Sequence, residues 1–451
     1  MWNYRDVRRS ALACACAWAW LGAALALHAP AVRADEDSVS CPAEVPATSK
    51  CYSGRDANNA IWLVAIPEKW NRVLVLHAHG GPEIRAPALA RSMADLKRWS
   101  VMVKDGNAWA GSAFRRGGYG VRMAAEDTEN LRQIFIQRFG KPRRTIMHGQ
   151  SWGGNVGAKV IELYATGADG VANYDGALLT SGVLGGGTRS YDYRMDLRVV
   201  YEYYCHNHPR ADEPQYPLWQ GLPDGSKLSG EEMRRRVGEC TGVDLPAEQR
   251  SVAQKRNLAN ILAVTRIPER TLESHMNWAT FMFADIVHKR LSDRNPFSTD
   301  GVVYKGSDDD RALNEGVARY KPDPRALAEL GDDSDLTGKV SIPTLTVHAI
   351  DDPTAFVELE SVYLDTRKRA NTQDLLVQTF TDEHDHSYLS DPEYPALLHA
   401  LLAWVDSGNK PTAAAIAASC EKLRDSFGAA CHFKTGYQPP PFEARVYPRN
   451  R

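Results

Sequence analysis

Short apolar segments alternate with segments of helical periodicity along most of this chain, and this alternation constrains the fold more than any other feature. The run 61–66 (IWLVAI) is typical of a strand, whereas the apolar spacing of 122–139 is typical of a helix. Such alternation predicts a mostly parallel sheet with helices on both faces, an α/β fold. The predicted strands are 61–66, 72–77, 109–114, 143–148, 175–181, 342–349 and 375–380, and the predicted helices are 122–139, 153–166 and 394–405.

The alternation is lost between about residues 188 and 340, after three consecutive glycines at 185–187. This stretch is aromatic, polar and too long for a loop, so it predicts an inserted, mainly helical subdomain. The predicted organisation is a core part at 35–187, a cap insertion at 188–340, a second core part at 341–406 and a tail at 407–451.

Residues 1–34 have the three parts of a secretory signal peptide. Arginines precede an apolar run at 11–27, and small residues stand at the −3 and −1 positions of a cleavage site that ends at Ala34. The apolar run is short for a membrane span. We therefore expect cleavage near Ala34, export to the periplasm or the extracellular space, and no stable membrane association of the mature chain.

Six cysteines follow this cleavage site, and an even number in an exported chain favours disulfide bonds. Many pairings are possible, and proximity in the sequence favours Cys41–Cys51, Cys205–Cys240 and Cys420–Cys431. No cysteine and histidine spacing is typical of a zinc site.

The charge balance argues against nucleic acid as a partner. The chain holds 54 basic and 56 acidic residues, and loss of residues 1–34 makes the mature chain slightly more acidic. Hydrophobic residues make up 43% and charged residues 24%, which is typical of a globular protein and excludes a disordered or fibrous one. The expected partner is a small molecule, and the sequence does not indicate an oligomeric state.

The pattern G-x-S-x-G at 149–153 lies between a predicted strand and a predicted helix. In that context it predicts a tight, strained turn that exposes the hydroxyl of Ser151 above the sheet. The N-terminus of the following helix would direct backbone N–H groups at developing negative charge. Ser151 is therefore the predicted nucleophile.

A serine nucleophile needs a base, and the base needs a carboxylate that orients it. On such a sheet the expected order along the chain is serine, acid, histidine. Asp352 follows strand 342–349 and is the favoured acid, with Asp351 as the alternative. His386 follows strand 375–380 and is the favoured base, with His384 as the alternative.

Glycines after strand 72–77 predict the remaining part of the site, an oxyanion hole. The backbone N–H groups of Gly81 and Trp152 are the expected donors, because Pro82 has no N–H. His79 is expected to brace this loop, and His77 and His348 are expected to be packed core histidines.

At these residues the chain resembles the α/β-hydrolase superfamily. The resemblance covers about residues 60–186 and 340–406. It rests on the motifs HGGP (79–82), GQSWGG (149–154), HAIDDP (348–353) and DHS (385–387). HGGP with G-x-SWG is also similar to secreted proline-type aminopeptidases of this fold, although Glu83 replaces the final glycine of their HGGPG pattern.

The resemblance implies acyl transfer through a Ser-His-Asp triad, which requires no metal and no organic cofactor. Three functions follow as hypotheses: a carboxylic ester hydrolase, an exopeptidase of the same fold, and a binding protein without activity. An exopeptidase would need acidic residues near the site to hold a free amine, and Glu83 and Glu202 are the candidates. Residues 333–338 resemble the start of a calcium loop, but Thr344 occupies the twelfth position, so no metal site is expected.

Overall fold

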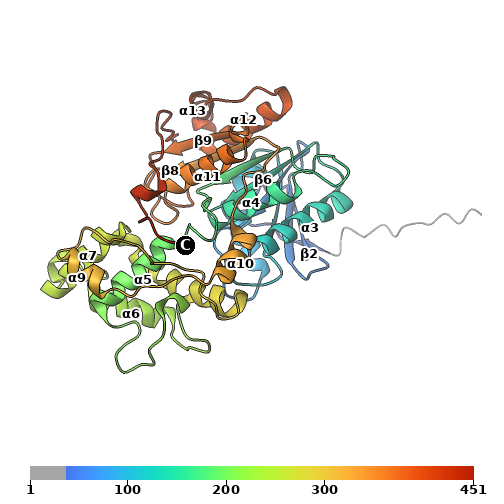
Figure 1. The fold of residues 1–451 in the computed structure, drawn as a ribbon. Coiled ribbons are helices and arrows are strands. Elements are labelled where there is room, and N and C mark those ends of the chain that lie inside the picture. The colour runs from blue at the N-terminus through green and yellow to red at the C-terminus, as the bar shows by residue number, and fades with distance from the viewer. Residues whose placement is uncertain (1–36) are drawn as a thin grey trace, which may run out of the picture. The chain divides into compact units, whose positions relative to one another are not determined.

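The seven predicted strands and two further strands form one nine-stranded sheet, which the computed structural model describes within residues 37–451 (Figure 1). The strand order is β1-β2-β3-β5-β4-β6-β7-β8-β9. Pairing is antiparallel from β1 to β5 and parallel from β5 through β4 to β9. The strands are β1 (Ser38–Val39), β2 (Lys50–Arg55), β3 (Ile61–Ile66), β4 (Val73–Ala78), β5 (Ala108–Ser112), β6 (Arg144–Gln150), β7 (Gly176–Thr180), β8 (Thr344–Ala349) and β9 (Leu376–Thr381).

Helices cover both faces of the sheet, as the sequence predicts. Along β4, Leu74 and Leu76 enter one hydrophobic core, whereas Val73 and Val75 enter the other. Helices α3 and α4 pack over the first core, and α1, α2 and α12 pack over the second. The helices outside the long insertion are α1 (Leu89–Arg98), α2 (Ser100–Lys104), α3 (Val121–Phe139), α4 (Trp152–Tyr164), α11 (Glu358–Arg369), α12 (Glu393–Ser407), α13 (Ala413–Glu421) and α14 (Arg424–Phe427).

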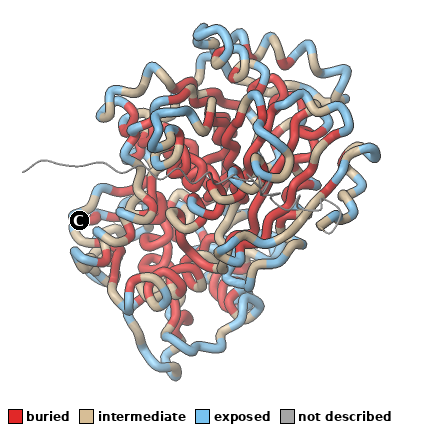
Figure 2. The backbone as a smooth tube through the Cα atoms, turned by 90° about the vertical axis from the view of Figure 1, so that its right-hand side faces the viewer, coloured by how far each residue is buried: buried red, intermediate tan, exposed pale blue. Residues whose placement is uncertain are grey.

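The segment between β7 and β8, residues 181–343, is mainly helical, and we call it the insertion. It contains its own buried residues, which continue the core beneath α3 and α4 (Figure 2). Its helices are α5 (Asp192–Cys205), α6 (Gly230–Thr241), α7 (Val252–Thr265), α8 (Leu272–Asn277), α9 (Asp310–Gly316) and α10 (Pro324–Ser334), with π-helical turns η4 (Trp278–Met282) and η5 (Asp285–Arg290).

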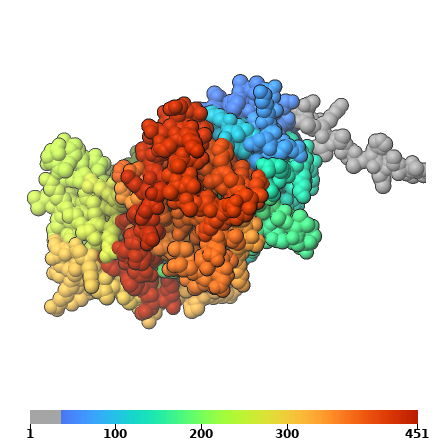
Figure 3. All heavy atoms as spheres, turned by 90° about the horizontal axis from the view of Figure 1, so that it is seen from above, coloured from blue at the N-terminus to red at the C-terminus, as the bar shows by residue number. Residues whose placement is uncertain are grey.

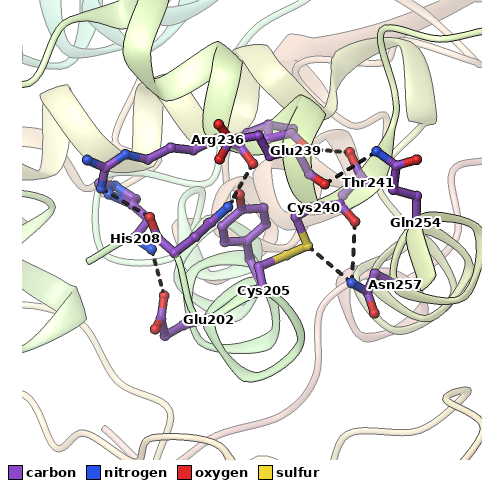
Figure 4. Close-up of a disulfide and its surroundings, with 12 residues drawn as sticks. Glu202, Cys205, His208, Arg236, Glu239, Cys240, Thr241, Gln254 and Asn257 are labelled. Carbon is purple, nitrogen blue, oxygen red and sulfur yellow. Dashed lines mark hydrogen bonds between the residues drawn. A yellow bond between two sulfur atoms is a disulfide. The ribbon is translucent and has the colours of Figure 1, made fainter. Parts of the chain in front are cut away.

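Within residues 37–451, three disulfide bonds pair the six cysteines as proximity in the sequence predicts. Cys41–Cys51 links the start of the described chain to β2, Cys205–Cys240 links α5 to α6, and Cys420–Cys431 closes a loop near α13. Around the second bond, Asn257 of α7 donates to Cys240, so three helices meet there (Figure 4). The insertion is therefore covalently fixed at the end of α5.

Residues 442–451 run between the insertion and the second part of the core, and we call them the strap (Figure 3). Arg449 is buried and pairs with Asp196 of α5 at 2.6 Å, while Arg445 lies 3.1 Å from Glu358 of α11. The strap therefore links α5 to α11 through one buried and one partly exposed ion pair.

The predicted signal peptide at 1–34 lies outside the described residues. Within residues 37–451, no helix combines the length and the apolar character that a bilayer span needs.

Candidate active site

Ser151 lies in a strained turn between β6 and α4. Its φ is 58° and its ψ is −123°, a conformation that non-glycine residues rarely adopt. Three backbone hydrogen bonds hold the turn: the Ser151 N–H donates to Thr180, and the Ser151 carbonyl accepts from Gly154 and Val183, at 2.8–2.9 Å. The strain is thus fixed by the neighbouring strand and by the first turn of α4.

The two glycines of the G-x-S-x-G pattern allow a very close approach of backbone segments. A Cβ atom on Gly149 would lie 2.1 Å from the carbonyl oxygen of Gly153. A Cβ atom on Gly153 would lie 2.0 Å from the carbonyl oxygen of Ala78, at the end of β4. Both positions therefore require glycine for the turn to form.

The structure brings together the three side chains that the sequence favours. The imidazole Nε2 of His386 lies 2.7 Å from the Oγ of Ser151, and its Nδ1 lies 2.7 Å from the Oδ2 of Asp352. Ser151 follows β6, Asp352 follows β8 and His386 follows β9, so all three lie at the carboxyl edge of the parallel strands.

The alternative residues lie elsewhere. His384 and Asp351 pair with each other at 3.0 Å, and each side chain is more than half exposed. Among the described residues neither of them makes a hydrogen bond with Ser151 or His386.

Asp352 is fully buried and binds two histidines. Besides His386 it faces His348 at 3.3 Å, and its other oxygen accepts from the N–H groups of Thr354 and Ala355. Burial raises the pKa of Asp352, but the charge of His386 and the hydrogen bond from His348 lower it more, so the net pKa lies below its usual range. The carboxylate is therefore ionised at neutral pH.

His348 has more partners than a packed core histidine. Its Nδ1 lies 3.2 Å from Glu360, its Nε2 donates to the Ala355 carbonyl at 2.7 Å, and its side chain is fully buried. Burial lowers the pKa of His348, but hydrogen bonds with Asp352 and Glu360 raise it to about 10. His348 is therefore a buried cation between two carboxylates, which the strand position of this histidine did not indicate.

The loop after β4 lies close to the serine turn. Gly81 has a φ of 65°, which favours glycine, and a Cβ atom on Gly80 would lie 2.1 Å from the Oε1 of Gln150. Within the described chain, the N–H groups of Gly81 and Trp152 donate no hydrogen bond to another backbone or side-chain group. Both predicted donors thus have free N–H groups: Gly81 in the loop after β4, and Trp152 directly after Ser151.

His79 packs against Phe114, with ring centroids 4.5 Å apart, and burial lowers its pKa to about 4. It is neutral at ordinary pH and makes a hydrogen bond with Gly80, which fits the predicted bracing role. His77 is also buried, where it contacts His148 at 2.9 Å.

A cavity of about 360 Å³ opens at Ser151 and His386. Gly81 and Trp152 border it, and the insertion contributes Tyr191, Arg194 and Trp278 to its wall. The complete lining is Gly80, Gly81, Pro82, Arg91, Ala94, Asp95, Arg98, Trp99, Gln150, Ser151, Trp152, Val183, Tyr191, Arg194, Trp278, Thr354, His386, Ser387 and Tyr388.

The charged residues of this lining are mostly arginines. The lining contains three arginines, Arg91, Arg98 and Arg194, and one carboxyl group, Asp95, whose pKa is raised by burial. Neither acidic candidate for binding a free amine borders the cavity: Glu83 pairs with Arg91 at 3.3 Å, and Glu202 accepts from the His208 N–H in the insertion (Figure 4). The cavity therefore favours negative charge.

The stretch that resembles a calcium loop has a structural role. Asp333 accepts from the N–H groups of Val121 and Arg122 at the start of α3, and Asp335 accepts from Thr188. These carboxylates therefore cap α3 and fix the start of the insertion.

Comparison with known proteins gives little sequence similarity. No family model matches the chain. Over 114 residues it is 29% identical to the o-phthalyl amidase of Xanthobacter agilis, a match that covers 24% of this chain and 23% of the amidase. The match thus spans less than a quarter of that relative.

The matches to solved structures have low TM-scores. The rice cell wall degrading esterase LipA of Xanthomonas oryzae is 12% identical with a TM-score of 0.37, over 84% of this chain and 90% of that one. Lipase A of Candida antarctica in its closed state is 11% identical with a TM-score of 0.39, over 81% and 78%. The assignment of the fold accordingly rests on the connectivity of this chain.

That connectivity is specific. From β2 onward the sheet has antiparallel β2 and β3 at one edge, then a crossover in which β5 precedes β4, then six parallel strands in all. The serine turn follows β6, and the acid and histidine follow β8 and β9 in that order. The chain therefore has the α/β-hydrolase fold, with a mainly helical insertion between β7 and β8.

Proposed function

We propose that this protein is a serine hydrolase that cleaves carboxylic esters through an acyl-enzyme on Ser151. The observation that carries the proposal is the pair of 2.7 Å hydrogen bonds from Ser151 to His386 and from His386 to Asp352, at the wall of a cavity. A serine, a histidine and a buried carboxylate in this geometry are the arrangement that nucleophilic catalysis needs.

In the proposed reaction, Nε2 of His386 accepts the hydroxyl proton of Ser151 as Oγ attacks the ester carbonyl. Nδ1–H of His386 donates to Asp352, which stabilises the imidazolium that forms. The N–H groups of Gly81 and Trp152 bind the oxyanion. His386 then protonates the leaving alcohol. In the second half of the reaction, His386 accepts a proton from a water molecule that attacks the acyl-enzyme. It then returns a proton to Oγ of Ser151 as the carboxylic acid leaves.

The insertion acts as a cap in this proposal, because Tyr191, Arg194 and Trp278 of the insertion line the cavity together with Ser151 and His386 of the core. Three disulfide bonds support an exported protein, since such bonds persist in oxidising compartments. The substrate is a small molecule that fits the cavity of about 360 Å³.

Amide hydrolysis is the second candidate, and the similarity to an amidase over 114 residues favours it. An exopeptidase that binds a free amine is disfavoured, since three arginines and one carboxyl group border the cavity. A positively charged amine would be repelled there.

The test compares the wild-type protein with Ser151→Ala on 4-nitrophenyl butyrate and on aminoacyl-4-nitroanilides. We expect ester turnover in the wild type and a loss of kcat of at least about 10⁴-fold in the variant. Turnover of the anilides in place of the ester would assign an aminopeptidase. Ester turnover that survives Ser151→Ala in a folded protein would refute the mechanism.

A further inference from the structure

Arg194 is a buried arginine that borders the active-site cavity. It lies in the first turn of α5, its residue is only 5% exposed, and it shares the cavity wall with Ser151 and His386. A buried cation is costly unless it has a counter-charge, so its partners are informative.

The only side-chain hydrogen bond of Arg194 within residues 37–451 goes to a neutral group. Its Nε donates to Nδ1 of His275 at 3.2 Å, and Nε2 of His275 lies 2.9 Å from the Pro353 carbonyl. Because Nε2 must donate to that carbonyl, Nδ1 is the acceptor and the imidazole is neutral. Burial and the charge of Arg194 lower the pKa of His275 to about 3, which agrees with this tautomer.

No carboxylate neutralises Arg194. Over the described part of the chain, no Asp or Glu oxygen lies within 4.0 Å of its guanidinium, and Nη1 and Nη2 make no hydrogen bond. The nearby Asp352 already binds His386 and His348. Arg194 therefore keeps an unbalanced charge and two unused N–H edges.

The other two cavity arginines differ in this respect. Arg91 donates to the Gly80 carbonyl at 2.7 Å and lies 3.3 Å from Glu83 and from Asp95. Arg98 donates to the Ser387 carbonyl at 3.0 Å and to Tyr394 at 2.9 Å, and lies 3.6 Å from Asp391. The guanidinium groups of Arg91 and Arg98 are thus already bound to protein carbonyl, hydroxyl or carboxylate groups, unlike that of Arg194.

Aromatic rings hold the Arg194 guanidinium in place. Its central carbon lies 4.3 Å from the Trp278 ring centroid and 5.3 Å from that of Tyr191, and these two rings stack on each other at 4.1 Å. Trp278 lies in the π-helical turn η4, a type of distortion that often occurs at functional sites. The rings orient the planar fork without neutralising it, and such a fork matches a carboxylate through two parallel hydrogen bonds.

We propose that Arg194 binds a carboxylate of the substrate, so that the preferred substrates are esters or amides that carry a free carboxylate besides the scissile bond. This inference rests on the proposed hydrolase function. The carboxylate belongs either to the acyl group or to the leaving group. In both cases it would form the same ion pair with the guanidinium of Arg194.

The first experiment compares two matched pairs of esters on the wild-type protein. Mono-4-nitrophenyl hexanedioate against 4-nitrophenyl hexanoate tests a carboxylate on the acyl group. 4-Carboxyphenyl hexanoate against 4-carbamoylphenyl hexanoate tests one on the leaving group. We expect kcat/KM of the charged member to exceed that of the neutral member by at least about tenfold in one pair.

The second experiment repeats the favoured pair with Arg194→Met, Arg194→Lys and the control Arg311→Met. Arg311 is an exposed arginine of α9 that does not border the cavity. The ratio of kcat/KM between charged and neutral substrate should fall at least about tenfold in Arg194→Met, fall less in Arg194→Lys, and stay unchanged in Arg311→Met. An unchanged ratio in a folded Arg194→Met protein would refute the proposal.

Inhibition of the wild type covers the case in which Arg194→Met does not fold. Hexanedioate should inhibit competitively at a concentration at least about tenfold lower than hexanediamide. Equal inhibition by the two compounds, or a preference for the neutral ester in both pairs, would overturn the carboxylate assignment while leaving the hydrolase proposal intact.

Failure of the hydrolase proposal would look different. If no ester or amide is cleaved, calorimetric titration with hexanedioate separates the two ideas. Binding that disappears in Arg194→Met but persists in Arg311→Met would support the carboxylate site without the reaction. Absence of binding in the wild type would overturn both.

Discussion

Asp352 and His348 form a buried chain of charges behind the proposed base. Glu360, His348, Asp352 and His386 contact one another in sequence, and only His386 reaches the cavity. The positive charge on His348 offsets one of the two buried carboxylates. We infer that His348 and Glu360 are positioning residues that keep Asp352 ionised and correctly oriented.

The buried charge of His348 predicts a specific dependence of stability on pH. The pKa of His348 is raised to about 10 in the folded protein from 6.5, so its stabilising contribution is complete below pH 6.5 and is lost as the pH rises through 10. In urea titrations, the free energy of unfolding of the wild type should fall by on the order of 5 kcal/mol between these pH values because of this group. His348→Gln should lose that part of the decrease, and an identical pH profile in both proteins would contradict the assignment.

The two histidines of the sequence DEHDHS provide a matched pair for activity. His386→Gln should lower kcat for esters by at least about 10³-fold, because the proposed base is removed. His384→Gln should change kcat less than about twofold, because that side chain pairs with Asp351 on the surface. Steady-state kinetics of the two variants decides the matter, and the reverse result would assign His384 as the base.

At this scale the sequence could predict residues whose chemistry is tied to a local pattern. Ser151 lies in a five-residue motif, and Asp352 and His386 follow strands that end at the same edge. Arg194 and His348 could not be predicted. Their significance depends on which groups face them, and those groups are up to 81 residues away in the case of Arg194 and His275.

The site depends on the serine turn and on two elements of the insertion. The serine turn depends on the approach of α4 to the end of β4 at Gly153, and the cavity depends on α5 and η4 of the insertion. Helix α5 is held at its start by the strap and at its end by the disulfide Cys205–Cys240. Constraint at both ends suits a helix that positions Arg194.

Removal of the disulfide between α5 and α6 tests this constraint. The bond closes a loop of 35 residues, so Cys205→Ser/Cys240→Ser should lower the free energy of unfolding by about 2–4 kcal/mol. Thermal and urea denaturation of the non-reduced proteins measures the effect. The matched variant Cys420→Ser/Cys431→Ser, whose bond lies outside the insertion, should leave ester KM unchanged, whereas the first variant should raise it.

Strands with continuous apolar runs could be predicted from the sequence, since β3, β4, β6 and β8 are buried along nearly their whole length. Strands β1 and β2, at one end of the sheet, and helices α1 and α2 were not predicted. Strand β2 (KCYSGR) is mostly polar and only half-buried, so its pairing with β3 depends on tertiary context. The same holds for the π-helical turns, which no periodicity indicates.

Across the whole molecule, the strap joins parts of the chain that are far apart in the sequence. Arg449 contacts Asp192 and Asp196 of α5, all three side chains are at most 4% exposed, and Tyr304 also donates to Asp196. Burial lowers the pKa of Arg449, but the charges of Asp196 and Asp192 raise it more, so its net pKa is raised and the arginine stays charged. This group links the strap to the insertion.

Arg449→Ala should therefore destabilise the folded protein strongly. The buried carboxylate of Asp196 would lose its ion-pair partner, and Asp192 would keep only Arg451, with an expected loss of about 3–5 kcal/mol in the free energy of unfolding. The control Arg424→Ala removes an exposed arginine that pairs with Glu421, and it should cost less than about 1 kcal/mol. Denaturant titrations compare the two, and a similar small loss in both would show that the strap does not hold the insertion.

The strap also sets an order of events during synthesis. Asp192 and Asp196 are made some 250 residues before Arg449 (253 separate Asp196 from Arg449), and domains generally fold as their residues emerge. The carboxylates of Asp192 and Asp196 in α5 therefore lack their arginine partners until residues 442–451 have been synthesised. A nascent chain that stops before the strap would carry Ser151, Asp352 and His386, but it would lack the ion pairs that fix α5, the helix that brings Arg194 to the cavity.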